Sequence, residues 1–332
     1  MGNSWKDKPV LVTGADGFIG SHLTEALVQK GARVRALVYY NSFGRWGWID
    51  HLPPGIRDAM EVFPGDIRDS GRTLDAVEGN AVVFHLASLI AIPYSYHAPE
   101  SYIQTNVMGG INILNACRRC GVERLIHTST SEVYGTAQYV PIDEKHPLQG
   151  QSPYSASKIA ADMMAESYYR SFDLPVSIIR PFNTYGPRQS ARAVIPTIMS
   201  QLFAGADRIK LGSLTPTRDF NYVSDTVSGF LSAAESTATI GRVVNIGSGR
   251  EIAIGDLVEM IFRITGKYAR VITDSQRIRP EKSEVERLLC DNTQAVALTG
   301  WKPSHTLEAG LEATAQWIRE HPEAFQTTDY CI

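Results

Sequence analysis

The stretch Thr13-Gly14-Ala15-Asp16-Gly17-Phe18-Ile19-Gly20 decides the fold. It follows the short apolar run Pro9–Thr13 and leads into a helical apolar pattern that stops near Gly31. Glycines let a backbone turn tightly and approach a pyrophosphate, whose charge is stabilised by a helix N-terminus. Three glycines alone are a weak signal, but their position between a first strand and a first helix predicts a dinucleotide-binding turn. The residues expected to form it are Gly14, Gly17, Phe18, Ile19 and Gly20.

Outward from this turn, strand and helix patterns alternate. Further strands are expected at 34–39, 61–63, 81–86, 124–128 and 176–180, with a long helix at about 152–172. This alternation predicts an α/β fold with a Rossmann-like, doubly wound parallel sheet. The pattern then loosens into a smaller, interleaved C-terminal region, expected at the carboxyl ends of the strands. We expect a dinucleotide-binding domain at 1–182, to which 219–255 returns, and a mainly substrate-binding region at 183–332.

Composition and charge exclude several classes of protein. The 332 residues carry a formal net charge of -3, with a pI of about 6.3, which argues against a broad basic surface for nucleic acid. The longest apolar run, at 81–92, is too short to cross a bilayer, which needs about 20 apolar residues. The start of the chain, through Lys6, lacks an export or myristoylation pattern. We expect a cytoplasmic protein without nucleic-acid or membrane partners.

Cysteine and histidine usage points the same way. Four scattered cysteines do not make a disulfide framework, which fits a reducing cytosol. Cys117 and Cys120 have the spacing of a redox pair, but they end an apolar-periodic helix and have no second pair for zinc. We interpret them as helix residues without a redox role. The 8 histidines show no ligand spacing, so no metal is expected. The other two cysteines are Cys290 and Cys331.

Tyr154 and Lys158 lie four residues apart in the expected helix and share one of its faces. A phenol with a pKa of about 10 is a poor base at neutral pH, but an adjacent ammonium and an oxidised nicotinamide both favour its phenolate. The Tyr-x-x-x-Lys spacing alone is common on helix surfaces. After a glycine turn of this kind it predicts a base that takes a proton from a sugar hydroxyl while hydride leaves the same carbon.

The choice between NAD and NADP is less clear from the sequence. An NAD-preferring fold usually ends its second strand with an acidic residue, whereas Tyr39-Tyr40-Asn41-Ser42 stands at this place. The first cation that could bind a 2′-phosphate is Arg45. We favour NAD and leave NADP open. Asp66, after the third strand, could accept from an adenine amino group, or it could cap a helix.

The motifs together resemble the extended short-chain dehydrogenase/reductases of the nucleotide-sugar epimerase and dehydratase family. The resemblance covers nearly the whole chain and implies further cofactor contacts at Asp66, Ile67, Leu86, Ala87, Ser88 and Asn106. It also implies that Asn183, Arg218 and Arg279 contact a substrate diphosphate; a guanidinium suits phosphate oxygens, although a lone arginine could also be a surface charge. The matching stretches are 13–20, 65–69, 85–88, 106–107, 129–135, 154–158, 180–183, 185–188, 218–220 and 245–249.

Within this resemblance, Thr130-Ser131-Glu132 indicates the reaction. Epimerases of the family carry Ser or Thr near Thr130 but usually lack a carboxylate two residues on. Once C4 of a sugar is a ketone, its C5 hydrogen is acidic, and a carboxylate such as Glu132 can remove it while the C6 hydroxyl leaves as water. Hydride then returns to C6, so the resemblance implies a 4,6-dehydratase. Many dehydratases have Thr-Asp-Glu and the GDP-mannose branch has Thr-Ser-Glu, so Ser131, a water that it holds, and Glu132 are alternative acids for the leaving hydroxyl. A salt bridge or a helix cap is the structural alternative for Glu132.

By overall likeness the chain is most similar to the N-acetylglucosamine 4,6-dehydratases of legionaminic acid biosynthesis. That group acts on UDP- or GDP-linked N-acetylglucosamine and supplies bacterial surface glycans, which implies this substrate or a related nucleoside-diphosphate hexose. No residue is derived as an N-acetyl pocket. The likeness includes the stretches 40–44, 46–48, 141–144 and 193–197.

Three rival functions remain in view. A UDP-sugar 4-epimerase would share the cofactor elements, but Glu132 speaks against it. A non-catalytic dinucleotide-binding regulator would need none of Thr130, Tyr154 and Lys158. A reductase of a small carbonyl compound fits the long C-terminal region and Arg218 poorly.

The expected helices at about 99–120 and 152–172 carry apolar positions on more than one side. This is consistent with one face on the sheet and one on a partner. The resemblance implies pairing through a four-helix bundle, so we expect a homodimer.

Overall fold

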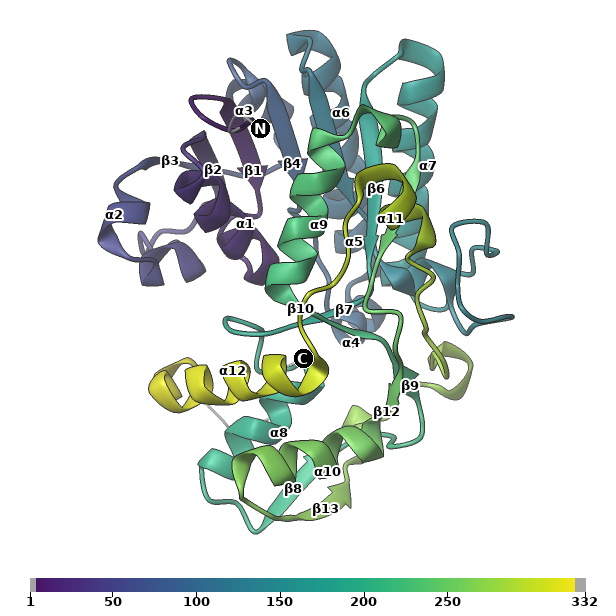
Figure 1. Cartoon of the computed structure of the whole chain (residues 1–332). Helices are drawn as coiled ribbons and strands as arrows, with labels where there is room; N and C mark the ends of the chain where they lie inside the picture. Colours follow the sequence, from purple (N-terminus) through teal and green to yellow (C-terminus); the bar gives the residue numbers. More distant parts are fainter. Residues whose placement is uncertain (1–3, 326–332) are drawn as a thin grey trace.

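A large parallel sheet forms the upper half of the molecule in Figure 1, above a smaller C-terminal region. The structure is a computed structural model that describes residues 4–325. The strands of the sheet are β1 (Pro9–Thr13), β2 (Arg33–Tyr39), β3 (Met60–Gly65), β4 (Val82–His85), β5 (Arg124–Thr128), β6 (Val176–Pro181) and β11 (Val243–Ile246).

The strand order of this sheet is β11-β6-β5-β4-β1-β2-β3, and every neighbouring pair is parallel. The predicted Rossmann-like sheet is therefore confirmed, with the ends of the predicted strands shifted by no more than two residues. The order reverses between β1 and β4, which is where open α/β sheets bind ligands, at the carboxyl ends of the strands. β11, from the loosely patterned second half of the chain, adds an edge strand beside β6.

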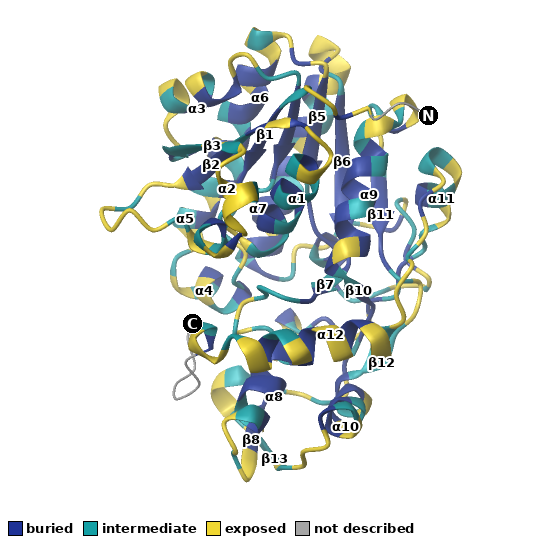
Figure 2. Ribbon diagram, turned by 60° about the vertical axis from the view of Figure 1, so that its left-hand side comes forward, coloured by how far each residue is buried: buried dark blue, intermediate teal, exposed yellow. Residues whose placement is uncertain are grey.

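Helices cover both faces of the sheet because side chains alternate along its strands. In β1, Val10 and Val12 belong to one core and Leu11 to the other. In Figure 2 the inner strands of the sheet are dark blue, whereas β3, at its edge, is mostly of intermediate burial. The first core is packed by α1 (Phe18–Gln29), α9 (Val223–Glu235) and α11 (Thr293–Thr299), the second by α3 (Ser70–Val77), α6 (Gly109–Cys120) and α7 (Pro153–Phe172).

The long predicted helix is α7, and local sequence fixes its start. Ser152 caps it: the Ser152 hydroxyl accepts from the backbone N–H of Ser155, and the Ser155 hydroxyl accepts from that of Ser152. Pro153 occupies the first helical position, where no backbone donor is needed. Asp173, in the left-handed conformation with φ of 54°, ends the helix.

The helix predicted at 99–120 is divided. α5 (Pro99–Tyr102) runs into one wide π-helical turn, Ile103–Met108, before α6 begins. Such turns are rare and frequently lie at functional sites. Asn106 lies in this turn and is buried.

The smaller region has its own apolar core, and the chain enters it more than once. Segments α9, β11 and α11 lie against the sheet between stretches of this region. The domain boundary near residue 182 stays a proposal. The remaining α-helices and strands among residues 4–325 are α2 (Pro54–Arg57), α4 (Ile92–His97), β7 (Asn183–Tyr185), α8 (Val194–Phe203), β8 (Arg208–Leu211), β9 (Thr217–Arg218), β10 (Phe220–Tyr222), β12 (Ile252–Ala253), α10 (Ile254–Thr265), β13 (Arg270–Thr273) and α12 (Leu307–Glu320).

The cysteines of the described chain are free thiols. Cys117 is buried in α6, where burial raises the pKa of its thiol, and Cys120 is less buried. Cys331 and the first three residues lie outside the described part. No helix between residues 4 and 325 is long and apolar enough to span a membrane.

Candidate active site

In the glycine turn between β1 and α1, the backbone lies in close contact with the loop after β4 and with the start of α1. Gly14 has a φ of +68°, and a Cβ there would lie 2.8 Å from the backbone nitrogen of Ala87. A Cβ on Gly20 would overlap the carbonyl oxygen of Gly14, so α1 starts directly against the turn. Gly17, the exposed N-cap of α1, leaves the first helical turn open. This is the shape that a pyrophosphate needs.

The loop after β4 is fastened to the same turn. Thr13 Oγ1 accepts from the backbone N–H groups of Leu86 and Ala87, at 3.1 Å each. Phe18 and Ile19 form the first turn of α1 and are partly buried. The cradle fits a dinucleotide, because any larger side chain at its close contacts would fill it.

Asn106 joins this loop to the catalytic helix. Its Nδ2 donates to the carbonyl oxygen of Leu89 and to Ser157 Oγ, at 2.9 Å each, and its Oδ1 accepts from Leu89 N at 2.8 Å. Ser88 lies partly buried just before this anchor. The π-helical turn thus holds the loop at the position where the resemblance implies cofactor contacts.

Asp66 follows β3 and pairs with Arg68, whose Nη2 lies 2.5 Å from Asp66 Oδ2. The hydrogen bond from Arg68 holds the pKa of Asp66 below its usual value. The cap of α3 is Asp69, so Asp66 does not have that role. Ile67 is buried against Gly109, where a Cβ would lie 2.7 Å from the Ile67 side chain.

The predicted catalytic hydroxyls meet at the end of β5. Thr130, Tyr154 and Lys158 are 8%, 7% and 4% exposed. The Tyr154 hydroxyl is hydrogen-bonded to the Thr130 side chain, and Lys158 Nζ donates to the carbonyl oxygen of Thr128 at 2.6 Å. Thr130 Oγ1 also accepts from Glu132 N at 3.2 Å. The end of β5 and the loop after it thus contact both Tyr154 and Lys158 of α7.

Burial shifts the proton affinities of this pair in opposite directions. It raises the pKa of Tyr154, which the hydrogen bond with Thr130 opposes. It lowers the pKa of Lys158 to about 8, which the charge of Asp162 opposes. Because Tyr154 is buried, a positive charge placed beside its hydroxyl would lower its pKa and a negative charge would raise it.

Asp162 is the centre of a buried cluster behind Lys158. Its Oδ2 accepts from Ser129 Oγ at 2.7 Å and from Arg180 Nε and Nη2 at 3.1 and 2.9 Å. Its Oδ1 lies 3.4 Å from His127 Nε2. Burial opposes ionisation, but His127 and Arg180 hold the pKa of Asp162 below its usual value. The cluster ties α7 to β5 and β6.

Arg180 extends this cluster toward the candidate acid and base. Its Nη1 donates to the Tyr134 hydroxyl at 3.0 Å, and that hydroxyl donates to Asn245 Oδ1 at 2.7 Å. Tyr134 ends the short 3-10 helix Ser131–Tyr134, which carries Ser131 and Glu132. The position of this helix is thus linked to α7 through buried hydrogen bonds.

Glu132 is accessible, whereas Ser131 is buried. The side chain of Glu132 is 12% exposed, and its Oε2 lies 3.6 Å from Arg279 Nη1. Ser131 is 3% exposed. The alternative of a salt bridge at Glu132 is therefore present in the structure, with an arginine expected to meet substrate.

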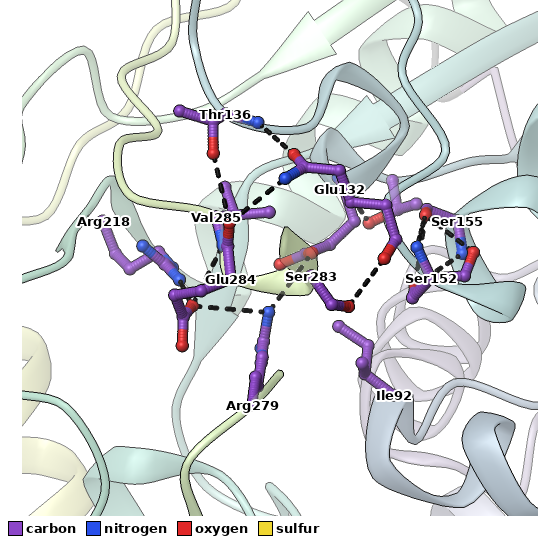
Figure 3. A network of polar contacts seen from close by, with 12 residues as sticks. Ile92, Glu132, Thr136, Ser152, Ser155, Arg218, Arg279, Ser283, Glu284 and Val285 are labelled. Carbon is purple, nitrogen blue, oxygen red and sulfur yellow. Dashed lines mark hydrogen bonds and ion pairs between the residues drawn. The ribbon is translucent and has the colours of Figure 1, made fainter. Parts of the chain in front are cut away.

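Arg218 and Arg279 converge on one carboxylate, that of Glu284 (Figure 3). Arg218 Nη2 lies 3.1 Å and Arg279 Nη1 3.8 Å from Glu284 Oε1. Asn183, in β7, has a buried Oδ1 with no hydrogen-bond partner among residues 4–325. The loop that carries Glu284 is fixed beside α4, because Ser283 Oγ is 2.6 Å from the Tyr96 hydroxyl.

Sequence reasoning missed Asp162, Arg180 and Glu284. Asp162 lies four residues after Lys158 on one helix face, and Arg180 opens a stretch that carried the resemblance, so both left a signal. Glu284 left none, because its pairing with Arg218 of β9 joins segments that are 66 residues apart in the sequence.

Comparisons with known proteins agree with this geometry. The family model of GDP-mannose 4,6 dehydratase matches residues 11–314. A UDP-glucose 4-epimerase of Mycolicibacterium smegmatis is 33% identical over 316 residues, covering 93% of this chain and 98% of the relative. The low-salt glycan biosynthesis protein Agl12 of Haloferax volcanii is 32% identical over 313 residues, covering 93% and 97%.

One similar solved structure contains the cofactor NAD. The structure of DesIV, the dTDP-glucose 4,6-dehydratase of Streptomyces venezuelae, contains bound NAD. It superposes with a TM-score of 0.84 at 28% identity, covering 96% of this chain and 98% of DesIV. Dehydratases and epimerases thus both occur among the relatives.

Proposed function

The chain belongs to the family of GDP-mannose 4,6 dehydratase and its relatives, NAD-dependent enzymes of nucleotide sugars, and on this premise we propose that it is a nucleotide-sugar 4,6-dehydratase. The proposed substrate is UDP- or GDP-linked N-acetylglucosamine or a related hexose, and the product is its 4-keto-6-deoxy sugar. The observation that carries the proposal is the carboxylate of Glu132, partly exposed two residues from Thr130, which bonds Tyr154.

Tyr154 is proposed to take the proton of the C4 hydroxyl. NAD bound at the glycine turn would supply the acceptor for hydride from C4 and the donor of hydride to C6. Lys158, one helical turn after Tyr154, is proposed to favour the phenolate through its positive charge. Thr130, which is hydrogen-bonded to Tyr154, is proposed to orient the reacting hydroxyl.

Glu132 is proposed to take the C5 proton once C4 is a ketone. Its Oε2 lies 3.6 Å from Arg279 Nη1, so the carboxylate is placed beside a residue that is proposed to contact the substrate. The C6 hydroxyl leaves as water with a proton from Glu132 or from a group held by Ser131, the buried neighbour. Asn183, Arg218 and Arg279 are proposed to hold the diphosphate.

The test is to incubate the protein separately with UDP- and GDP-linked N-acetylglucosamine, UDP-glucose and GDP-mannose and to measure product masses. We expect one product lighter by one water, with deuterium at C5 in deuterated water. An unchanged mass with a new configuration at C4 would favour the 4-epimerase, for which Thr130, Tyr154 and Lys158 suffice.

The Glu132→Gln variant separates the two reactions. It should lose dehydration while the protein still forms NADH from bound NAD, because the phenol and the ammonium are unchanged. The matched control is Glu123→Gln, an exposed carboxylate paired with Lys8. Full dehydration by Glu132→Gln would contradict the proposed base.

We further propose that the protein is a cytoplasmic homodimer that supplies a surface-glycan sugar. Free thiols support the compartment, and the relative Agl12 supports the pathway. Apolar side chains exposed along α7 and the neighbouring π-helical turn support pairing with a second copy. A monomer mass in solution scattering at micromolar concentration would contradict the dimer. These side chains are Ile103, Met108, Met163, Tyr169 and Phe172.

A further inference from the structure

The end of β2 offers no acid to a bound cofactor. β2 ends at Tyr39, and Tyr40 and Asn41 follow it. In dinucleotide-binding folds, an acidic residue at this place accepts from the 2′-hydroxyl of the adenosine ribose and disfavours a 2′-phosphate. Since the family is NAD-dependent, another group has to supply this discrimination.

Asp16 reaches this position from the glycine turn. Its Oδ2 accepts from Tyr39 N at 3.2 Å, so the carboxylate lies directly at the tip of β2. Within residues 4–325 no side chain donates a hydrogen bond to it. Burial raises the pKa of Asp16, and the hydrogen bond from Tyr39 N opposes this shift.

The loop after β2 holds Asp16 in place. Trp48 N donates to the carbonyl oxygen of Asp16 at 3.0 Å. Gly47, with a φ of +53°, packs so closely that a Cβ would lie 2.6 Å from that oxygen. Two contacts from this loop therefore hold the backbone of Asp16, and the hydrogen bond from Tyr39 N holds its carboxylate at the end of β2.

The neighbouring cation is already neutralised. Arg68 approaches Tyr39 from the other side, with its Nη2 at 3.4 Å from the Tyr39 hydroxyl, but its guanidinium is held by Asp66. Arg45 lies exposed in a loop whose backbone Asn41 fixes. Two carboxylates and one paired arginine thus surround the end of β2, which disfavours a dianionic phosphate there.

We propose that Asp16 replaces the missing acid of β2, accepts from the adenosine 2′-hydroxyl and excludes NADP. This assignment rests on NAD binding and not on the dehydratase reaction. Dehydration could fail with every sugar and the cofactor preference would still be measurable.

The experiment measures binding of NADH and NADPH to the full chain freed of nucleotide, by nicotinamide fluorescence. The unaltered protein should bind NADH more tightly. Asp16→Asn, which keeps an acceptor for Tyr39 N, should lower the ratio of the NADPH to the NADH dissociation constant by on the order of tenfold, mainly through tighter NADPH binding. Asp16→Ser serves as a second variant if Asp16→Asn does not fold.

The matched control is Asp50→Asn. Asp50 Oδ2 accepts from Trp46 N at 2.8 Å, so it also fixes this loop through a backbone donor, and its removal should leave the ratio unchanged. An unchanged ratio in the Asp16 variants, even with weaker binding of both cofactors, would overturn the proposal. So would equal affinity of the unaltered protein for NADH and NADPH.

Discussion

Carboxylate–arginine pairs lie on both sides of the candidate site, and the two sides differ in burial. Behind Lys158, the side chains of Asp162 and Arg180 are 0% and 2% exposed. On the substrate side, those of Glu284 and Arg279 are 16% and 25% exposed. A fully buried pair cannot change partners without leaving a buried charge, whereas a partly exposed pair can exchange one anion for another. The first side therefore fixes the catalytic geometry and the second is suited to a substrate phosphate.

Asp162→Asn should break the buried side. Removing the carboxylate leaves Arg180 buried without its counter-ion, so we expect the free energy of unfolding to fall by about 3 to 5 kcal/mol. Urea denaturation followed by circular dichroism measures this loss. The control is Glu166→Gln on the same helix, whose exposed pair with Arg170 should contribute less than about 0.5 kcal/mol. Equal small losses in both variants would contradict the comparison.

Lys158→Met should remove a pH dependence from the buried side. Burial lowers the pKa of Lys158 from 10.5 to about 8, with Asp162 opposing, so between these values the unfolded chain binds a proton that the folded chain does not. The stability of the unaltered protein should consequently rise relative to Lys158→Met as the pH increases from about 8 to 10.5. The expected gain is about 3 kcal/mol, at about 1.4 kcal/mol per pKa unit.

Denaturant midpoints across this pH range, at constant ionic strength, test the prediction. The neighbouring His85 and His127 have pKa values lowered by burial, so their titration lies below this range. Lys8→Met is the control, because Lys8 pairs with Glu123 at the surface. A difference between Lys158→Met and the unaltered protein that stays flat with pH would show that Asp162 compensates the burial of Lys158.

The same contrast explains what the sequence could predict. The glycine turn, the strands and the spacing of Tyr154 and Lys158 are local patterns, so they predicted the sheet and the amino acids at its carboxyl end. The substrate side depends on Glu284, which pairs with Arg218 at a separation of 66 residues in the sequence. No local sequence pattern indicates such a pair. Asp16 was part of the quoted turn, but its meeting with Tyr39 required the three-dimensional path of β2.

Arg279→Gln should weaken substrate binding without unfolding the protein. The variant removes a charged donor to the diphosphate, so we expect the dissociation constant of UDP or GDP, whichever binds, to rise about tenfold. Calorimetric titration measures it, and the melting temperature should stay nearly constant because Arg279 is partly exposed. Arg277→Gln, which alters a pair with Asp274 in the same loop, is the control. Unchanged nucleotide affinity would remove Arg279 from the diphosphate site.

Glu284→Gln should change nucleotide affinity least, but in the opposite direction to Arg279→Gln. Glu284 contacts Arg218 and Arg279, so its negative charge competes with a diphosphate for the same guanidinium groups. Neutralising it should tighten nucleotide binding by about two- to fivefold, because the two arginines are then free of a competing carboxylate charge. Weaker binding would instead mean that Glu284 itself contacts the nucleotide. A loss of stability comparable to that of Asp162→Asn would mean that both sides of the site are fixed, and that the arginines do not exchange partners when substrate binds.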